Sequence, residues 1–315
     1  MRDVEMAKDF DQVAWDAALE EACRQIVRLA VEEDLGALGD CTTEALVAES
    51  ATSRAQITAR QPGVVAGLRA VPLVLAAFDG RLEFFPGMED GSVVRPGDRV
   101  GQVEGPARAL LSAERTLLNL LGRLSGIATL TRQYVQAVAG TRAQIYDTRK
   151  TTPGWRRLEK YAVRCGGGRN HRLGLFDAVL IKDNHLAWGA EASAEGMPRF
   201  TPAQAVARAR QWIKKRVPGW LSSRMIVEIE VDTLEQLSAV LPARPDVVLL
   251  DNMPPAVLAE AVARRNATAP EVQLEASGGI TLETVRAVAE TGVDRISIGA
   301  LTHSAGSLDF GLDWS

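Results

Sequence analysis

The sequence lacks the residues on which several large classes of protein are built. Its three cysteines, Cys23, Cys41 and Cys165, are odd in number and widely spaced, which predicts neither a disulfide framework nor a zinc site. No apolar run approaches the roughly 20 residues that span a bilayer. The N-terminal residues are acidic and lack the apolar core of a signal peptide. We therefore expect a cytoplasmic protein with no membrane partner.

Sequence motifs of common enzyme classes are also missing. The chain contains no G-x-x-x-x-G-K-[ST], which excludes a P-loop enzyme, and no G-x-S-x-G, which excludes a nucleophile elbow. Cys165 has no evident His and Asn partners, so we do not expect covalent thiol catalysis. A pI near 5.6 argues against nucleic acid as a partner, because proteins that bind the phosphate backbone need a broad basic surface.

One span of this acidic chain is strongly basic. Between Arg142 and Lys182, ten Lys and Arg side chains face only three acidic ones, although the whole chain has a net charge of −4. Converging cations are unfavourable until an anion neutralises them, so a cleft for an anionic substrate is one explanation. A solvated basic helix face is the other, and a charge run by itself favours that alternative.

The residues around this span favour the cleft. Gly166–Gly168 allow a close backbone approach, or a positive φ, just before a further group of basic residues. The segment AQIYDTRK has the pattern of a strand that ends at Arg149 and Lys150, and FDAVLIK that of a strand that ends at Lys182. Two strands that deliver cations at their carboxyl ends indicate the rim of an α/β barrel, where active sites are found.

The chain changes its pattern near residue 140. Before it, an amphipathic helix is expected over Trp15–Glu33, a helix over Leu68–Phe78, and short alternating strands separated by Pro-Gly and Asp-Gly turns. Such turns also occur in biotinyl and lipoyl carrier barrels, but no exposed hairpin lysine is evident here. A long helix follows from about Leu110, with Ser112 and Arg115 near its start and a potential interruption at Ser125-Gly126.

Beyond residue 140, strands alternate with helices, which predicts a parallel sheet curled into a barrel. The expected helices are Pro202–Lys214, Thr233–Val240, Pro255–Arg264 and Thr281–Thr291. The expected strands are Ala143–Tyr146, Ala178–Ile181, Met225–Val231, Val247–Leu250, Gln273–Ala276 and Arg295–Ile298. The small, polar segment Trp188–Arg199 is expected to be a mobile loop.

The later strands also end in chemically useful residues. VEIEV places Glu228 and Glu230 on one face, VVLLD ends in Asp251, and a Ser-Gly-Gly turn before the helix at Thr281 offers backbone N–H groups to an anion. Each has a structural alternative, since a carboxylate after a strand is more often a helix N-cap. Carboxylates combined with few histidines favour Mg²⁺, which binds one or two carboxylates together with substrate phosphates.

These motifs resemble those of the quinolinate phosphoribosyltransferases, also called carboxylating nicotinate-nucleotide pyrophosphorylases. The resemblance rests on DTRKTTPGWRRLEKYAVRCGGGRNHRLGLFDAVLIKDNH, SAERTLLNLLGRLSGIA, EIEVDTLEQL, VVLLDNM, LEASGGI and DRISIGALTHSA, and it covers most of the chain. Met253 stands where Phe is usual in the family. The resemblance implies transfer of phosphoribosyl from phosphoribosyl pyrophosphate to quinolinate, giving nicotinate mononucleotide, CO₂ and pyrophosphate in de novo NAD biosynthesis.

The resemblance also implies a type II phosphoribosyltransferase fold. Residues 1–115 would form an N-terminal open α/β sandwich, to which the tail at about 304–315 returns, and residues 116–303 an incomplete α/β barrel that carries the catalytic site. It further implies a homodimer, or a higher oligomer built from it, in which the neighbouring subunit completes each active site.

Individual roles follow from the same resemblance. Glu230 and Asp251 would hold Mg²⁺ and serve catalysis together with Lys150 and Lys182. The quinolinate site would comprise Arg115 of the neighbouring subunit, Thr148, Arg149, Lys150, His171, Arg172 and Lys182. The phosphate site would comprise Ser277, Gly278, Gly279, Gly299, Ala300 and Leu301.

Two other functions fit part of the pattern. A non-catalytic anion-binding or regulatory protein on a barrel scaffold would keep Arg149 and Arg172 but would not need Glu230 and Asp251. A molybdenum-associated homologue that acts on another base shares the TRK and GGG-like segments. It is not expected to carry the KDNH found at Lys182–His185.

Overall fold

The structure is a computed structural model that describes residues 8–189 and 200–314. Its chain forms two compact units. Unit 1 comprises residues 1–11, 134–149 and 170–298, and unit 2 comprises residues 12–133, 150–169 and 299–315. Each unit consists of three separate segments of the chain, whereas the predicted division had one boundary, at residue 115. That residue lies inside a helix. Residues 150–169, expected in the barrel, belong to unit 2.

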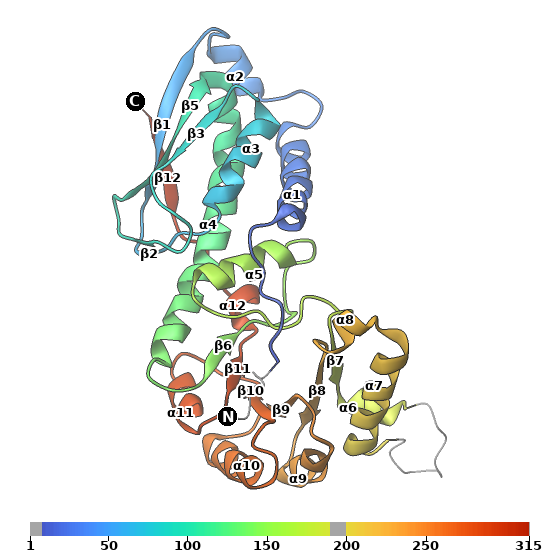
Figure 1. Ribbon diagram of the computed structural model, residues 1–315. Coiled ribbons are helices and arrows are strands. Elements are labelled where there is room, and N and C mark those ends of the chain that lie inside the picture. The colour runs from blue at the N-terminus through green and yellow to red at the C-terminus, as the bar shows by residue number, and fades with distance from the viewer. Residues whose placement is uncertain (1–7, 190–199, 315) are drawn as a thin grey trace. The chain divides into compact units, whose positions relative to one another are not determined.

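Unit 2 is built on a four-stranded antiparallel sheet with the order β12-β1-β5-β3 (Figure 1). These strands are β1 (Thr52–Ala59), β3 (Glu83–Pro86), β5 (Arg99–Pro106) and β12 (Phe310–Trp314). The tail of the chain thus pairs with β1, with Ala55 opposite Trp314 and Ala59 opposite Phe310. A short ladder joins β2 (Gly63–Val64) to β4 (Val93–Val94).

Helices complete unit 2. Helix α1 (Ala17–Leu35) starts at Asp16, whose carboxylate accepts from the N–H of Leu19, and it buries a stripe of Leu19, Cys23 and Val27. This agrees with the predicted helix to within two residues at each end. The remaining elements are α2 (Cys41–Leu46), a 3₁₀ turn at Leu68–Ala70, α3 (Val71–Phe78), α5 (Arg156–Cys165) and α12 (Ala300–His303).

The long helix α4 (Ala107–Ala137) is continuous, so the interruption considered at Ser125-Gly126 is wrong. It also begins earlier than expected, which places Ser112 and Arg115 well inside it. Gly126 is required for packing: a Cβ there would lie 1.9 Å from the carbonyl oxygen of Gly306. The Ser125 hydroxyl accepts a hydrogen bond from the backbone N–H of Ala66 at 2.9 Å. The Ser-Gly pair therefore lets the tail and a loop approach the helix without breaking it.

Unit 1 contains a six-stranded parallel sheet with the order β6-β11-β10-β9-β8-β7 (Figure 1). The strands follow chain order, yet the first lies beside the last, as in a curled sheet that stays open between β6 and β7. They are β6 (Gln144–Tyr146), β7 (Ala178–Ile181), β8 (Ile226–Val231), β9 (Val247–Asp251), β10 (Gln273–Ser277) and β11 (Arg295–Ser297). All lie within one residue of the predicted strands, and the predicted fold class is confirmed.

Helices connect the strands of unit 1. They are α6 (Asp183–Ala187), α7 (Pro202–Arg216), α8 (Gly219–Ser222), α9 (Leu234–Val240), α10 (Pro255–Thr268) and α11 (Val285–Glu290), with a 3₁₀ turn at Leu241–Ala243. Most of the predicted loop at Trp188–Arg199 lies outside the described residues. Among the helices that the structure describes, none is both long and apolar enough to cross a membrane.

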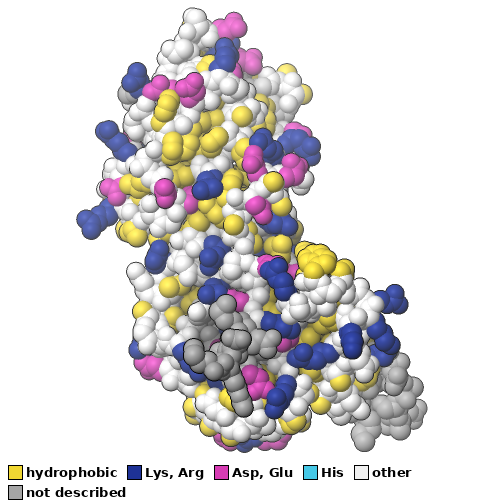
Figure 2. All heavy atoms as spheres, in the orientation of Figure 1, with side chains coloured by type: hydrophobic (Ala, Val, Ile, Leu, Met, Phe, Trp, Pro, Cys, Tyr) yellow, Lys and Arg dark blue, Asp and Glu magenta, His cyan; other side chains and the backbone are white. Residues whose placement is uncertain are grey.

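The visible surfaces carry mixed charge. Figure 2 shows Lys and Arg side chains near α7, whose last turn contains Lys214, Lys215 and Arg216. Over the visible face of unit 2, basic and acidic side chains are interspersed. The basic span of the sequence contributes to both units: residues 142–149 and 170–182 belong to unit 1, and residues 150–169 belong to unit 2.

Candidate active site

The first part of the site is the end of strand β6 in unit 1. Asp147 follows the strand and is fully buried, and its carboxylate accepts from the side chain of Asn170 at 2.7 Å and from the N–H of His171 at 2.8 Å. The buried charge is thereby compensated by two donors. Asp147 ties the segment that carries His171 and Arg172 to the edge strand β6, on the open side of the sheet.

Two predicted anion ligands, Arg149 and Arg172, come together in unit 1. Arg149 is half-buried, and its Nε has no hydrogen-bond partner in the described part of the chain. Arg172 is buried, and its Nη1 lies 3.5 Å from the carbonyl oxygen of Ala178. Burial, and then the neighbouring charge of Arg149, lowers the pKa of Arg172. Two guanidinium groups that repel each other in a partly dry site favour a bound anion.

A cation and two carboxylates lie at the ends of the next strands. Lys182, directly after β7, forms an ion pair with Glu230 on β8, and Glu230 is only 14% exposed. Asp251 ends β9, and its Oδ2 accepts from the side chain of Asn252 at 2.7 Å. Lys182 and Glu230 are therefore in direct contact in unit 1. The sequence predicted only that both lie on the same rim of the barrel.

The Ser-Gly-Gly turn follows β10, beside the end of β9. Ser277 pairs with Asp251 in the parallel register, and its carbonyl accepts from the N–H of Asn252. Gly278 and Gly279 have φ values of 96° and 60°, which favour glycine. A Cβ at Gly278 would lie 2.1 Å from the Asn252 side-chain oxygen. The helix expected from Thr281 begins only at Val285, because residues 282–284 form a turn, so that prediction is corrected.

The remaining predicted residues belong to unit 2, apart from Thr148, which is half-buried after β6. Lys150 is exposed, and its side chain lies against Gly299, where a Cβ would approach Lys150 Cδ to 2.9 Å. The Thr302 hydroxyl donates to the carbonyl of Lys150 at 2.8 Å. Unit 2 thus joins Lys150 to the turn of Gly299, Ala300 and Leu301. Arg115 is exposed on α4.

Sequence reasoning missed several residues that shape this region. Glu275, in the middle of β10, is fully buried close to Glu228 and His171. The sequence signal that could have found it is the presence of an acidic residue inside a predicted buried strand. Asn252 adopts a left-handed conformation with φ 53°, which Asn tolerates better than most residues. Its signal was the Asp-Asn pair directly after a buried strand.

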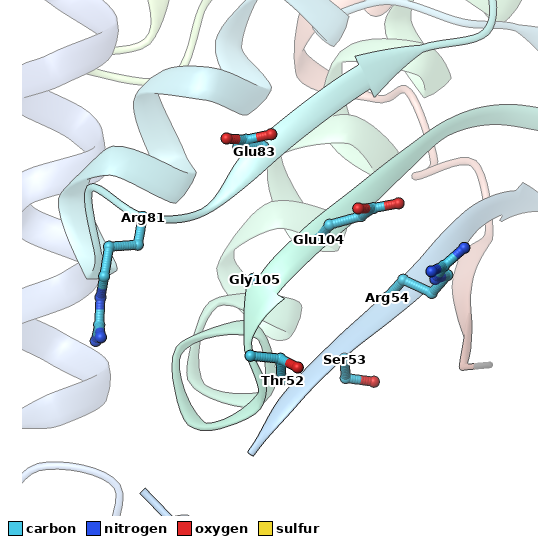
Figure 3. A pocket seen from close by; sticks show the side chains of 7 residues that line it. All are labelled: Thr52, Ser53, Arg54, Arg81, Glu83, Glu104 and Gly105. Atoms are coloured by element: carbon cyan, nitrogen blue, oxygen red, sulfur yellow. The ribbon is translucent and has the colours of Figure 1, made fainter. Parts of the chain in front are cut away.

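A separate polar hollow of about 390 Å³ lies in unit 2, at the ends of strands β1, β3 and β5 (Figure 3). It contains none of the predicted site residues. Its lining is Thr52, Ser53, Arg54, Arg81, Glu83, Glu104 and Gly105.

The donor set at Glu230 and Asp251 fits a magnesium ion completed by a substrate. Both are carboxylates, the hard oxygen ligands that Mg²⁺ prefers. Glu230 is the next-to-last residue of β8, and Asp251 is the last residue of the neighbouring parallel strand β9. In the described part of the chain, no third acidic residue, Cys or His joins them in a compact metal-binding group. Two carboxylates leave several coordination positions for phosphate oxygens and water.

Comparison with known proteins agrees with this geometry. Models of the N-terminal and C-terminal domains of quinolinate phosphoribosyl transferase match residues 40–125 and 127–313. The chain is 45% identical to the carboxylating nicotinate-nucleotide pyrophosphorylase of Mycobacterium leprae, covering 93% of this chain and 97% of that protein. It is 40% identical to a probable carboxylating enzyme of Bacillus subtilis, covering 89% of each.

A solved structure gives the same result at the level of the fold. The nicotinate-nucleotide pyrophosphorylase of Francisella tularensis superposes with a TM-score of 0.85 at 34% identity, covering 98% of this chain and all of that one. Both halves of the chain and their order are therefore matched. The chain belongs to the quinolinate phosphoribosyltransferase family, the carboxylating nicotinate-nucleotide pyrophosphorylases.

Proposed function

We propose that this enzyme transfers the phosphoribosyl group of phosphoribosyl pyrophosphate to quinolinate. The reaction releases pyrophosphate and CO₂ and yields nicotinate mononucleotide for de novo NAD biosynthesis. Family membership supports the overall reaction. The site geometry and the sequence motifs support the roles that we propose for individual residues.

The observation that carries the proposal is the pair of buried Arg172 and half-buried Arg149. Quinolinate is a dianion, and planar guanidinium groups suit carboxylates because each can donate two parallel hydrogen bonds. The buried Nε of Arg149 lacks a hydrogen-bond partner among the described residues, and repulsion between the two cations is relieved when a dianion binds. Thr148 and Lys182 line the same ligand, and Arg115 reaches it from the neighbouring subunit of a homodimer.

Glu230 and Asp251 are the residues that would hold Mg²⁺ in the presence of a phosphorylated substrate. The ion, when bound, stabilises the negative charge of the departing pyrophosphate. The two carboxylates themselves stabilise the positive charge that develops on the ribose as the bond to pyrophosphate breaks. Lys182, now paired with Glu230, supplies a cation to the carboxylates or the pyrophosphate.

The phosphate of the phosphoribosyl group is held by Ser277, Gly278 and Gly279, which offer a hydroxyl and backbone N–H groups at the end of β10. Loss of CO₂ from the pyridine leaves a carbanion at C2. The cations around the ring stabilise that charge.

The test is turnover with quinolinate, phosphoribosyl pyrophosphate and Mg²⁺, followed through CO₂ and nicotinate mononucleotide. Nicotinic acid lacks the second carboxylate, and an unpaired buried cation costs about 1–3 kcal/mol. We therefore expect kcat/KM for nicotinic acid to be about 10-fold to 100-fold lower than for quinolinate. Comparable values for the two acids would contradict the two-guanidinium site.

A further inference from the structure

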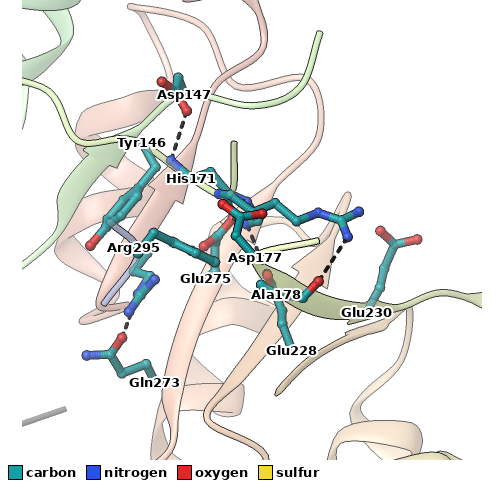
Figure 4. A network of polar contacts seen from close by, with 12 residues as sticks. Tyr146, Asp147, His171, Asp177, Ala178, Glu228, Glu230, Gln273, Glu275 and Arg295 are labelled. Carbon is teal, nitrogen blue, oxygen red and sulfur yellow. Dashed lines mark hydrogen bonds and ion pairs between the residues drawn. The ribbon is translucent and has the colours of Figure 1, made fainter. Parts of the chain in front are cut away.

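The imidazole of His171 is buried in unit 1, and Figure 4 shows His171 together with Asp147, Glu228 and Glu275. The residue is 6% exposed, and its ring lies 4.2 Å, centroid to centroid, from the ring of Phe10 at a tilt of 32°. Phe10 comes from the N-terminal segment of the chain and is itself buried with Tyr146, Ala178, Ile226 and Val247. One face of the imidazole is thus covered by an aromatic ring.

Both ring nitrogens of His171 lie against protein groups. Nδ1 accepts a hydrogen bond from the backbone N–H of Arg172 at 2.8 Å, so Nδ1 carries no proton while this bond exists. The proton of the neutral ring is therefore on Nε2. This atom lies 3.0 Å from Oε2 of Glu228 and 3.5 Å from Oε1 of Glu275.

The two glutamates provide a fixed support for the ring. Both are fully buried, Glu228 on β8 and Glu275 on β10. Glu228 interacts electrostatically with Arg295 and Arg172, and Glu275 with Arg295 and Glu228. The Nε2–H group of His171 is the donor placed between the two carboxylates.

The segment that follows β6 connects this buried cluster to the proposed ligand site. The N–H of His171 donates to Asp147, and the N–H of the next residue, Arg172, donates to the His171 ring. Two successive backbone groups are therefore fixed, one by a carboxylate and one by the imidazole. The guanidinium of Arg172 extends from this anchored backbone towards the carbonyl of Ala178, with Arg149 nearby.

We propose that His171 is a positioning residue and not a ligand of the substrate. Its ring, supported by Glu228 and Glu275 and stacked on Phe10, holds the backbone of Arg172 so that this guanidinium is ready for a quinolinate carboxylate. The inference rests on the proposed function, because Arg172 must bind the dianion. It replaces the role that the family resemblance implied for His171, that of a direct contact to quinolinate.

Two substitutions of His171 distinguish the role of Nδ1 from the role of Nε2. In His171→Asn the side-chain oxygen occupies the place of Nδ1 and can accept from Arg172, whereas the amide of His171→Gln reaches the place of Nε2 and leaves that N–H unpaired. We expect the KM for quinolinate to stay within about 3-fold of wild type in His171→Asn and to rise about 10-fold or more in His171→Gln. The KM for phosphoribosyl pyrophosphate should change less than about 2-fold in both.

The reverse order, with His171→Gln active and His171→Asn impaired, would place Nε2 on the substrate and overturn the proposal. Equal losses in the two variants would also overturn it, since the acceptor at Nδ1 would then be irrelevant. Thermal unfolding of both variants checks that each is folded before the kinetics are compared.

A second measurement needs no variant and no turnover. The chain has three histidines, so ¹⁵N labelling of histidine in the wild-type enzyme gives few ring signals, and His171→Asn assigns the one of interest. We expect His171 to remain the neutral Nε2–H tautomer with and without saturating quinolinate. A ring that becomes doubly protonated or changes tautomer on binding would overturn the proposal. Failure of the proposed function would instead appear as absent product with an unchanged tautomer.

Discussion

At the scale of single residues, the ion pair between Lys182 and Glu230 has a consequence for the proposed metal ligands. In Glu230→Gln the lysine is released and stays available to an anion, and Asp251→Asn removes a carboxylate that contacts no cation in the described structure. We expect each substitution to lower kcat by about 100-fold or more, because both remove charge that stabilises the transition state.

Binding of quinolinate should be nearly unaffected in the same two variants. Calorimetry with quinolinate alone measures this, and Arg149→Ala serves as the control in which affinity should fall. A collapse of quinolinate affinity in Glu230→Gln or Asp251→Asn, with turnover little changed, would show that these carboxylates do not serve the metal and the ribose.

Glu275 makes folding stability depend on pH. Burial, and then the charge of Glu228, raises the pKa of Glu275 to about 7 from 4.5. Because the folded-state pKa lies above the unfolded value, the stabilising contribution is complete below about pH 4.5 and is lost as the pH rises through 7. Between pH 5 and pH 8 the unfolding free energy of Glu275→Gln should therefore fall less than that of the wild type, by about 1 kcal/mol or more. Urea unfolding of both proteins at the two pH values measures the difference, and parallel curves would contradict the assignment.

The sequence alone could place Glu228 and Glu230 on one face of a strand, because side chains alternate with a period of two. It could not reveal that Glu228 is buried with His171 and Glu275 while Glu230 is partly exposed beside Lys182. That difference depends on which strands are neighbours and on Phe10, which is more than 150 residues away in the chain. Long-range packing of this kind leaves no local pattern.

At the scale of elements, the buried parallel strands were the most predictable part. Strands β7, β8 and β9 are short runs rich in Val, Ile and Leu that stop at or just before a charged residue. Such composition is typical of parallel strands that are covered on both faces. Helix ends were less predictable. The start of α11 at Val285 was missed because Thr281–Thr284 carry residues that hydrogen-bond locally: the Thr284 hydroxyl accepts from the N–H of Thr281.

Helix α4 gives a prediction about packing within unit 2. In Gly126→Ala the new methyl group would meet the carbonyl oxygen of Gly306, a backbone atom that cannot rotate away. We expect the unfolding free energy to fall by about 3 kcal/mol or more, as in overpacked cores. Gly80→Ala is the matched control, since a Cβ there meets nothing within 4 Å. Equal denaturation midpoints for the two variants would show that the tail moves away without cost.

At the scale of the whole molecule, the proposed dimer makes the position of Arg115 testable. Arg115 is exposed on α4. In a two-fold symmetric dimer whose active sites are shared, each site takes Arg115 from one subunit and Asp251 from the other. Arg115→Ala and Asp251→Ala should then each be nearly inactive, because every site in either homodimer lacks one of the two residues.

Co-expression of these two variants should restore activity. A hybrid dimer has one site with both residues intact and one site that lacks both, and random pairing makes half of the dimers hybrid. The mixture should therefore reach about a quarter of wild-type activity by this counting of two-fold dimers. Two different affinity tags allow the hybrid itself to be purified, and its activity should be about half of wild type. A purified hybrid no more active than either parent would place Arg115 in the same subunit as Asp251, or outside the site.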